Sequence, residues 1–268
     1  MAEERHICAL LRQGCGGCPL LETPYPEQLR QKQARVEALL GEFGPVSPIL
    51  GMEHPWHYRN KAISTFCTGP GRRLDSGIYA AGTHRVVPGA SSFYQINPEQ
   101  TEVLYRTALD GAGLDGTQTV VDAYCGVGTI GLAAAGRARR VLGVEFNPSA
   151  ARCAAQNARA NGAGNARFLC ADATAYLQGM AARGERADVV FLDPPRAGST
   201  PEFLGAVDRM GPERIVYISC NPETQRRDLR LLAGWGWRAR LLQPVDLFPH
   251  TEHVECVAVL AKIRGGGM

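Results

Sequence analysis

The 268-residue chain contains no apolar run long enough to span a membrane, and its first residues contain no apolar core of the kind found in secretory leaders. We also find no internal repeat in the sequence. Nine cysteines without a leader favour thiols and metal ligands over disulfides. These absences argue against membrane, secreted and repeat proteins, and we expect a cytoplasmic protein.

A strong charge of either sign is lacking as well. The formal net charge is +3, which permits RNA binding but differs from the charge of a protein with a basic tail. Hydrophobic residues make up 45% of the chain, which argues against disorder. The length suffices for one catalytic domain with a small appendage.

A glycine loop at residues 126–131 has the spacing G-x-G-x-x-G. It follows a predicted strand, Thr119 to Ala123, and opens a predicted helix, Ile130 to Ala135. The next predicted strand, Arg140 to Val144, leads into Glu145, which lies where an acid can bind ribose hydroxyls, about 20 residues after the loop. The pattern fits NAD and S-adenosylmethionine equally, and a plain tight turn is the simpler alternative.

Two acidic positions farther along the chain distinguish these cofactors. Asp172 follows the predicted strand Arg167 to Cys170, where the strand could end beside an adenine. An Asp-Pro-Pro-Arg turn at residues 193–196 follows the predicted strand Ala187 to Leu192. A dehydrogenase has no obvious use for this acidic turn. In a methyltransferase the turn would line the binding site of the methyl donor and the target base. The alternative is a rigid turn without a role in binding.

Cys220 follows the predicted strand Arg214 to Ile218 and precedes the predicted helix Thr224 to Leu232. Ligands of open α/β sheets bind outside the carboxyl ends of the strands, which is where this thiol is expected. The following helix N-terminus predicts a lowered thiol pKa. A small buried apolar residue is the alternative, because most free cysteines are of that kind.

The arrangement of elements predicts an α/β protein with a doubly wound sheet between Gly116 and Ile263, where strands and helices alternate. An amphipathic helix is predicted at Gln28 to Leu40, and short strands are predicted between Val46 and Val87. We divide the chain into a cysteine loop with its helix at 1–45, a short-strand region at 46–90 and a catalytic domain at 91–268.

Five stretches of the chain, from about Ser91 to Ile263, resemble in sequence and order the RNA uracil-5-methyltransferases, which make 5-methyluridine in 23S ribosomal RNA or in transfer RNA. The stretches are Ser92-Phe93-Tyr94-Gln95-Ile96-Asn97, Asp122-Ala123-Tyr124-Cys125-Gly126-Val127-Gly128, Asp193-Pro194-Pro195-Arg196-Ala197-Gly198, Ser219-Cys220-Asn221-Pro222-Glu223-Thr224 and Phe248-Pro249-His250-Thr251-Glu252-His253-Val254-Glu255. The N-terminal part is similar to the iron–sulfur members of that family in Cys8, Cys15-Gly16-Gly17-Cys18, Gln28-Leu29, Lys32 and Tyr58-Arg59-Asn60-Lys61. The resemblance implies a class I S-adenosylmethionine-dependent methyltransferase fold, Rossmann-like, whose last strand, Val254 to Ile263, is antiparallel.

The resemblance also assigns the chemistry. Cys220 is expected to add to carbon 6 of uracil, which makes carbon 5 nucleophilic toward the sulfonium methyl group. Glu255 is expected to remove the carbon 5 proton so that the thiolate can leave. An exposed strand-end carboxylate is the alternative for Glu255, and turn packing is the expectation for His250 and His253. Arg196 is expected to orient an RNA phosphate or base.

The cofactor and metal residues are carried over in the same way. The residues expected to line the S-adenosylmethionine site are Gln95, Tyr124, Gly126, Thr129, Glu145, Asp172 and Asp193. Three expected ligands of a 4Fe–4S cluster are Cys8, Cys15 and Cys18. Such a cluster normally takes four thiolates, and the family's fourth cysteine has no counterpart here, so we expect a labile or incomplete cluster unless Cys67 substitutes.

The chain departs from the family in two regions. The usual N-terminal oligonucleotide-binding-like barrel is absent, and the stretch Gly82 to Pro88 runs almost directly into Gly89 to Phe93, where the family has a central domain of many tens of residues. This joint resembles a deletion that removes part of the RNA-binding surface. Three hypotheses remain: a monomeric RNA uracil-5-methyltransferase acting on 23S ribosomal RNA or on transfer RNA, an amino-group methyltransferase, and a non-catalytic RNA-binding remnant. No protein partner is indicated.

Overall fold

The computed structural model describes residues 8, 14–58, 65–68, 74–79, 86–88 and 97–262, with backbone only for the three short segments 65–68, 74–79 and 86–88. The chain forms two compact units. The larger unit comprises Gln33–Leu50, Glu102–Val245 and Val254–Met268, and the smaller comprises Met1–Lys32, Gly51–Thr101 and Asp246–His253. Among the described residues, no helix is long and apolar enough to cross a membrane.

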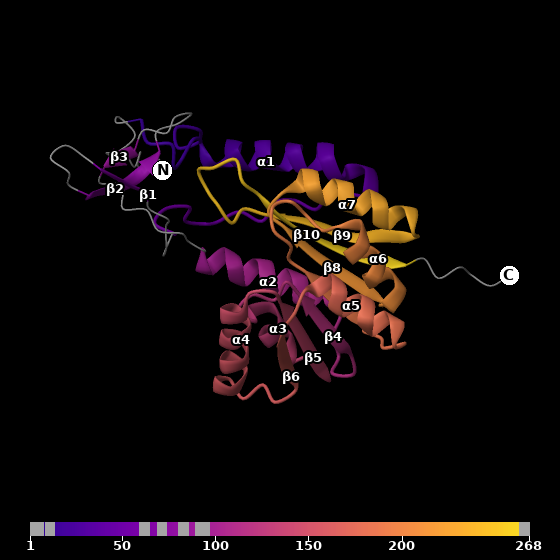
Figure 1. Cartoon of the computed structure of the whole chain (residues 1–268). Coiled ribbons are helices and arrows are strands. Elements are labelled where there is room, and N and C mark those ends of the chain that lie inside the picture. Colours follow the sequence, from indigo (N-terminus) through magenta and orange to yellow (C-terminus); the bar gives the residue numbers. More distant parts are fainter. Residues whose placement is uncertain are drawn as a thin grey trace. The chain divides into compact units, whose positions relative to one another are not determined.

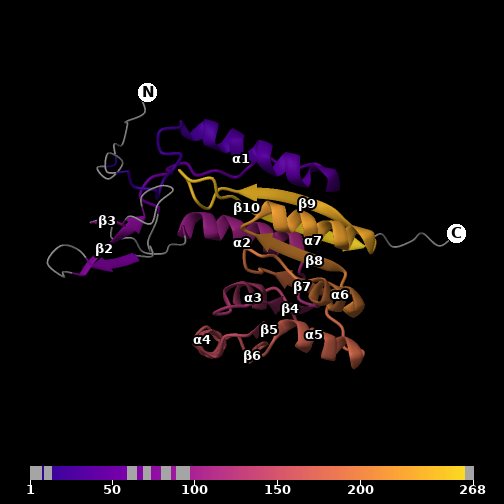
Figure 2. The same ribbon diagram turned by 45° about the horizontal axis from the view of Figure 1, so that its top comes forward.

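The larger unit is built on a seven-stranded sheet in the order β6-β5-β4-β7-β8-β10-β9, which can be followed from β6 to β9 in Figure 2. The strands are β4 (Thr119–Ala123), β5 (Arg140–Glu145), β6 (Ala166–Cys170), β7 (Val189–Leu192), β8 (Arg214–Ser219), β9 (Trp237–Val245) and β10 (Glu255–Lys262). Strands β6, β5, β4, β7 and β8 pair in parallel, and β10 pairs antiparallel with both β8 and β9. The predicted doubly wound sheet with an antiparallel last strand is confirmed.

Helices pack on both faces of this sheet. They are α1 (Tyr25–Leu40), α2 (Pro98–Ala112), α3 (Thr129–Ala135), α4 (Pro148–Ala160), α5 (Ala173–Ala182), α6 (Pro201–Met210) and α7 (Pro222–Gly234), with a 3₁₀ turn, η2, at Gly41–Phe43. Helices α5, α6 and α7 share one apolar cluster with the sheet, and α2 and α3 share another (Figure 1). Burial on both faces explains why β7 and β8 are almost entirely apolar.

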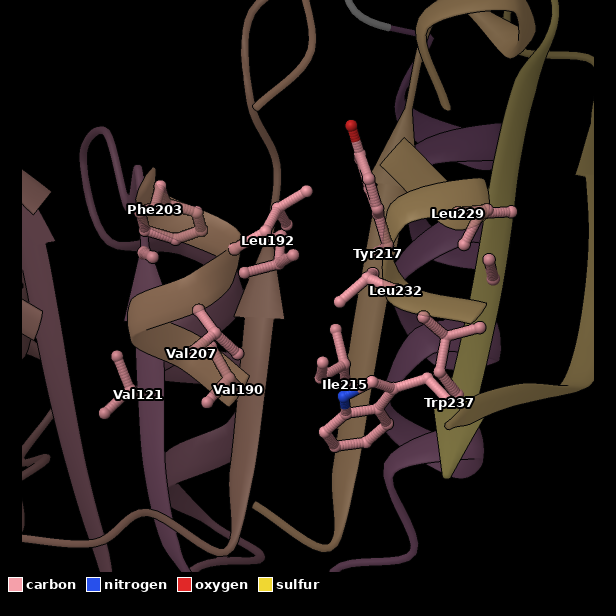
Figure 3. Close-up of a cluster of buried hydrophobic side chains, with 14 of the residues drawn as sticks. Val121, Val190, Leu192, Phe203, Val207, Ile215, Tyr217, Leu229, Leu232 and Trp237 are labelled. Atoms are coloured by element: carbon pink, nitrogen blue, oxygen red, sulfur yellow. The ribbon is translucent and has the colours of Figure 1, made fainter. Parts of the chain in front are cut away.

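The first of these clusters fills the space between the sheet and α6 and α7. Phe203 and Val207 of α6 and Leu229 and Leu232 of α7 pack on β-strand residues such as Val190 (Figure 3). Deleting a buried side chain of this size typically costs about 2–5 kcal/mol of stability. The cluster therefore holds α6 and α7, which flank the loops after β7 and β8, firmly on the sheet.

The smaller unit contains a three-stranded antiparallel sheet of β1 (Thr65–Thr68), β2 (Leu74–Tyr79) and β3 (Val86–Pro88). Short strands were predicted between Val46 and Val87. That prediction is wrong for the described residues 46–58, which form no strand. They make only one isolated β-bridge, between Leu50 and Val245. Pro45, Pro48 and Pro55 interrupt that stretch, and a proline cannot donate to a sheet ladder.

A buried polar network ties the start of α1 to residues 246–253 within the smaller unit. Lys32 Nζ lies 2.6 Å from Asp246 Oδ1. Gln28 donates to His250 Nδ1 at 3.1 Å and accepts from the His250 backbone N–H at 2.8 Å. The ring of Trp56 lies 4.2 Å from that of His250. His250 is thus a buried turn residue, as predicted.

Candidate functional site

Four loops or strand ends meet at one edge of the sheet in the larger unit. The strand order places β4, β7, β8 and β10 side by side, and the register aligns Ala123 with Leu192 and Leu192 with Tyr217. Because β10 is antiparallel, its first residues lie beside the end of β8, with Cys256 opposite Ser219. The residue after β8 is Cys220 and the first residue of β10 is Glu255, so the two predicted catalytic residues lie at the same edge.

The Cys220 thiol is half-buried, and its pKa is raised to about 11. Burial is the main cause, the neighbouring carboxylates of Glu255 and Asp193 contribute to the rise, and Arg196 opposes it. The predicted lowering of this pKa is therefore wrong. Loss of solvation and two nearby negative charges outweigh the favourable effect of the N-terminus of α7.

Glu255 is buried, with 7% of its surface exposed. Burial raises the pKa of its carboxyl to about 8, Asp193 adds to the shift, and Arg196 opposes it. The alternative of an exposed strand-end carboxylate is thus wrong. A carboxyl whose pKa lies near neutrality can both take up and release a proton, as a general base requires.

Two further acids lie near the carboxyl ends of β4 and β7. Asp193 is exposed, yet protein surrounds it on most sides and raises the pKa of its carboxyl to about 6. Asp122, at the end of β4, is fully buried, and burial raises its pKa to about 7. Its Oδ2 accepts from the Gly131 N–H at 2.8 Å, whereas its buried Oδ1 finds no partner among the described residues. An orphaned buried acceptor at a sheet edge is a feature that a bound ligand can satisfy.

The glycine loop adopts a conformation that requires positive φ at Tyr124 (62°), Gly126 (54°) and Gly128 (86°). A Cβ on Gly128 would lie 2.9 Å from the ring of Phe168, so a side chain has no room there. The loop therefore packs closely on Phe168 at Gly128, whereas a Cβ on Gly126 would meet nothing within 4 Å.

Glu145, at the end of β5, holds the loops on either side of it. Its Oε2 accepts from the Gly126 N–H at 2.9 Å, and its Oε1 accepts from the Asn147 N–H at 2.7 Å.

The other predicted cofactor residues lie in different settings. Thr129 is exposed at the first position of α3. Asp172 is the N-cap of α5, with Oδ1 accepting from the Ala175 N–H at 2.8 Å. Gln95 lies outside the described residues.

Sequence reasoning missed two aromatic residues at this edge. Phe146 follows Glu145 and is 76% exposed. The sequence could have indicated this exposed ring, because a residue that directly follows the last residue of a strand lies beyond the sheet and its core. Tyr105 of α2 was not predicted because α2 itself was not. Burial raises the pKa of Tyr105 to about 12, and Asp193, Asp122 and Glu255 add to that shift, which places the phenol within range of all three carboxyls.

The predicted metal ligands are less well supported. Cys8 is exposed, and Cys15 and Cys18 are half-buried. Among the described residues, no group of three histidine, cysteine or acidic side chains is placed to hold a metal ion. The side chain of Cys67 lies outside the described residues. These residues do not form a four-thiolate site, and no step of the chemistry depends on one.

Comparisons with known proteins identify the family of the chain. The sequence model of the tRNA (uracil-5-)-methyltransferase family matches residues 86–263. An uncharacterized RNA methyltransferase of Halalkalibacterium halodurans is 52% identical in an alignment 379 positions long, gaps included, which covers 94% of this chain and 82% of the relative. A second such protein, from Bacillus cereus, is 38% identical over 97% of this chain and 56% of its own length. The chain thus spans little more than half of that relative.

Among solved structures, the Pyrococcus abyssi tRNA (uracil-54, C5)-methyltransferase in complex with S-adenosyl-L-homocysteine superposes with a TM-score of 0.68. The sequences are 22% identical, and the match covers 92% of this chain and 86% of that one. At this identity the likeness shows the fold, which is that of class I S-adenosylmethionine-dependent methyltransferases. Together with the family match and the relatives, it shows that the chain belongs to the tRNA (uracil-5-)-methyltransferase family.

Proposed function

We propose that this protein transfers a methyl group from S-adenosylmethionine to carbon 5 of a uridine in RNA, through a covalent bond between Cys220 and the base. The observation that carries the proposal is the register of β10 against β8, which brings Glu255 to the strand end that presents Cys220. An amino-group methyltransferase needs neither a thiol nor a base at these positions.

Cys220 and Glu255 have separate roles in this reaction: Cys220 adds to the uracil ring, and Glu255 removes a proton from it. The Cys220 Sγ forms a bond to carbon 6 of the uracil ring, and carbon 5 gains the electron density to take the methyl group. The Glu255 carboxylate then accepts the carbon 5 proton, the carbon 6–sulfur bond breaks, and the thiolate is released. A pKa of about 8 for Glu255 suits this exchange near neutral pH.

S-adenosylmethionine supplies the electrophilic methyl group when it is bound at the end of β4 and β5. In this proposal Glu145 accepts from the ribose hydroxyls, and the exposed ring of Phe146 offers a face for the adenine. The other residues proposed to line the pocket are Gln95, Tyr124, Gly126, Thr129, Asp172 and Asp193. The orphaned Oδ1 of Asp122 supports a bound group at this end of the sheet.

The proposed substrate is 23S ribosomal RNA, because the cysteine spacing at the N-terminus is similar to that of the iron–sulfur members. Transfer RNA is the second candidate, and the description of the matched family favours it. Incubation with 23S and transfer RNA transcripts, followed by nucleoside analysis for 5-methyluridine, separates the two.

The covalent step has a direct test. RNA that contains 5-fluorouridine has no carbon 5 proton for Glu255 to remove, so the adduct should persist. Incubation with labelled S-adenosylmethionine should yield a protein–RNA band that survives denaturation, and Cys220→Ala should lack it. Transfer of label to unsubstituted RNA with no such band would contradict the mechanism, and no transfer at all would favour an RNA-binding remnant.

We also propose that Cys8, Cys15 and Cys18 bind an incomplete iron–sulfur cluster. Anaerobic purification followed by iron and sulfide assays should give less than one cluster per chain. A stoichiometric, air-stable cluster that survives Cys67→Ser would contradict this proposal.

A further inference from the structure

The backbone around Arg196 is fastened to the first turn of α7, the helix that follows Cys220. The Arg196 carbonyl oxygen accepts from Asn221 Nδ2 at 3.2 Å and from Thr224 Oγ1 at 3.1 Å. Asn221 is the N-cap of α7 and the residue directly after Cys220. The position of Arg196 is thus tied to the helix start beside the thiol.

Asp228, one turn farther along α7, holds the next part of this segment. Its side chain is buried, and its Oδ2 accepts from the Ser199 N–H at 2.8 Å and from the Tyr217 hydroxyl at 2.6 Å. Its Oδ1 accepts from Arg227 Nε at 2.9 Å. Arg227 Nη2 in turn donates to the carbonyl oxygens of Ala197 and Ser199, at 3.0 and 2.8 Å. Because Tyr217 belongs to β8, one carboxylate links this strand, α7 and segment 196–199.

The fit at this point is tight. Gly198 has a φ of 76°, and a Cβ on it would lie 2.7 Å from both Asp228 Oδ2 and Arg227 Nη2. Segment 196–199 therefore packs its backbone directly on the carboxylate and the guanidinium. Changing this buried carboxylate would leave the Ser199 N–H and the Tyr217 hydroxyl without their acceptor.

The charged groups that act on Cys220 come from two elements. Glu255 on β10 and Asp193 in the turn after β7 disfavour the thiolate, and Arg196 in the same turn favours it. Arg196 acts on Glu255 in the same sense, favouring the carboxylate. The position of the Arg196 guanidinium therefore influences the charge state of both Cys220 and Glu255.

We propose that Asp228 is a positioning residue of the methyl-transfer site. Through Ser199 and Arg227 it holds segment 196–199 on α7, and it thereby keeps the Arg196 guanidinium beside Cys220 and Glu255. This inference rests on the proposed function in naming Cys220 as the nucleophile. Its test, however, measures the thiol itself and needs no RNA.

The test is the pH dependence of alkylation at Cys220 by iodoacetamide, followed by mass spectrometry of the peptide that contains it. Only the thiolate reacts, so the profile reports the charge environment of this sulfur. The exposed Cys153 serves as an internal control in each sample. Two variants are compared with the wild type. Asp228→Asn removes the negative charge that pairs with Arg227, and Arg196→Gln removes the cation near Cys220.

Both variants should move the Cys220 profile to higher pH and slow alkylation at pH 8 by about three- to tenfold, while Cys153 is unchanged. Asp208→Asn is the matched control, because Asp208 accepts from Trp237 Nε1 at 2.7 Å and does not contact segment 196–199. It should leave the Cys220 profile in place even if it lowers the melting temperature. If Asp228→Asn does not fold, Arg227→Gln removes the two bonds to the segment and should give a smaller shift in the same direction.

A Cys220 profile that moves in Arg196→Gln but in neither α7 variant would overturn the proposal, because Asp228 would then be a structural residue alone. A profile that moves equally in Asp208→Asn would overturn it as well. Failure of the proposed function has a different signature: the wild type makes neither 5-methyluridine nor an adduct, whatever the alkylation profiles are.

Discussion

The sheet edge divides into two halves, and the acids that follow the strands, Glu145 in one half and Asp193 in the other, are held differently. In the half after β4 and β5, Glu145 uses both of its oxygens to accept backbone N–H groups of the adjoining loops. Beside it, Phe146 stands exposed. In the half after β7 and β8, the acids and the thiol are surrounded by protein, which raises the pKa of Asp193, Glu255 and Cys220.

The difference matches what each half is proposed to do. A half that binds a nucleoside gains from groups already fixed by hydrogen bonds and left open to the ligand, because little ordering remains to be done on binding. A half that moves protons gains from poor solvation, because it brings the pKa of Glu255 to about 8, near the working pH. The comparison predicts that changes in the second half abolish or trap the reaction, whereas changes in the first weaken cofactor binding.

The largest effect is expected from Cys220→Ala. Methyl transfer should fall to background, while the affinity for S-adenosylmethionine stays nearly unchanged, because the thiol acts on the base and not on the cofactor. Calorimetry and label transfer measure the two quantities. Retention of more than a few per cent of the activity would show that another group is the nucleophile.

Glu255→Gln should trap the reaction after methylation. Addition of Cys220 and transfer of the methyl group can proceed, but the carbon 5 proton stays and the carbon–sulfur bond cannot break. A methylated protein–RNA adduct should therefore accumulate and be visible on a denaturing gel. Normal turnover without an adduct would leave Glu255 a structural carboxyl.

The same substitution also probes the buried carboxyl without any substrate. The pKa of Glu255 is raised from 4.5 to about 8, so the folded protein holds a proton that the unfolded chain releases between these pH values. Stability from this group is complete below pH 4.5 and is lost as the pH rises through 8.

Glu255→Gln cannot ionise, so it should become more stable than the wild type above pH 8, by an amount on the order of a few kcal/mol. Urea unfolding at pH 5, 7 and 9 measures the difference. Glu185→Gln, at an exposed position, is the control and should show no such trend. An equal difference at pH 5 and pH 9 would mean that the carboxyl is not held protonated by burial.

Much of the larger unit was predictable because its signals are local. The apolar runs of β4, β7 and β8 and the glycine loop define the sheet edge, and they placed Cys220 and Asp193 correctly. The boundaries of α7 and β5 differ by only one or two residues from prediction. The antiparallel direction of the last strand came from the family resemblance, and the order of the strands was not predicted, because sequence patterns alone do not specify which strands are neighbours.

The rest depends on three-dimensional surroundings. Two polar residues of α7, Gln225 and Asp228, lie on its buried side and were not predicted. Gln225 Nε2 donates to the carbonyl oxygens of Tyr217 and Cys256, which come from two different strands. The raised pKa of Cys220 was likewise missed, because burial and the charge of Glu255 act across strands that are far apart in sequence.

In the binding half of the edge, Glu145→Ala should weaken S-adenosylmethionine binding by about 1–3 kcal/mol, the typical cost of leaving hydrogen-bond donors without their acceptor. Two backbone N–H groups and the ribose hydroxyls would lose their acceptor. Calorimetry measures the change, with Glu185→Ala as a remote control. Tight binding of NAD and none of S-adenosylmethionine would contradict the assignment of the whole site.

The smallest effect is expected from Phe146→Ala. The ring is 76% exposed, so its removal should leave the melting temperature unchanged. Loss of a stacking face for the adenine should weaken S-adenosylmethionine binding by about 1 kcal/mol, while Phe146→Tyr, which keeps the ring, should bind as the wild type does. The methyl-transfer rate at saturating cofactor should be the same in all three proteins, because Phe146 belongs to the half that binds. A variant with unchanged affinity but a lower rate would show that the two halves are not separable in this way.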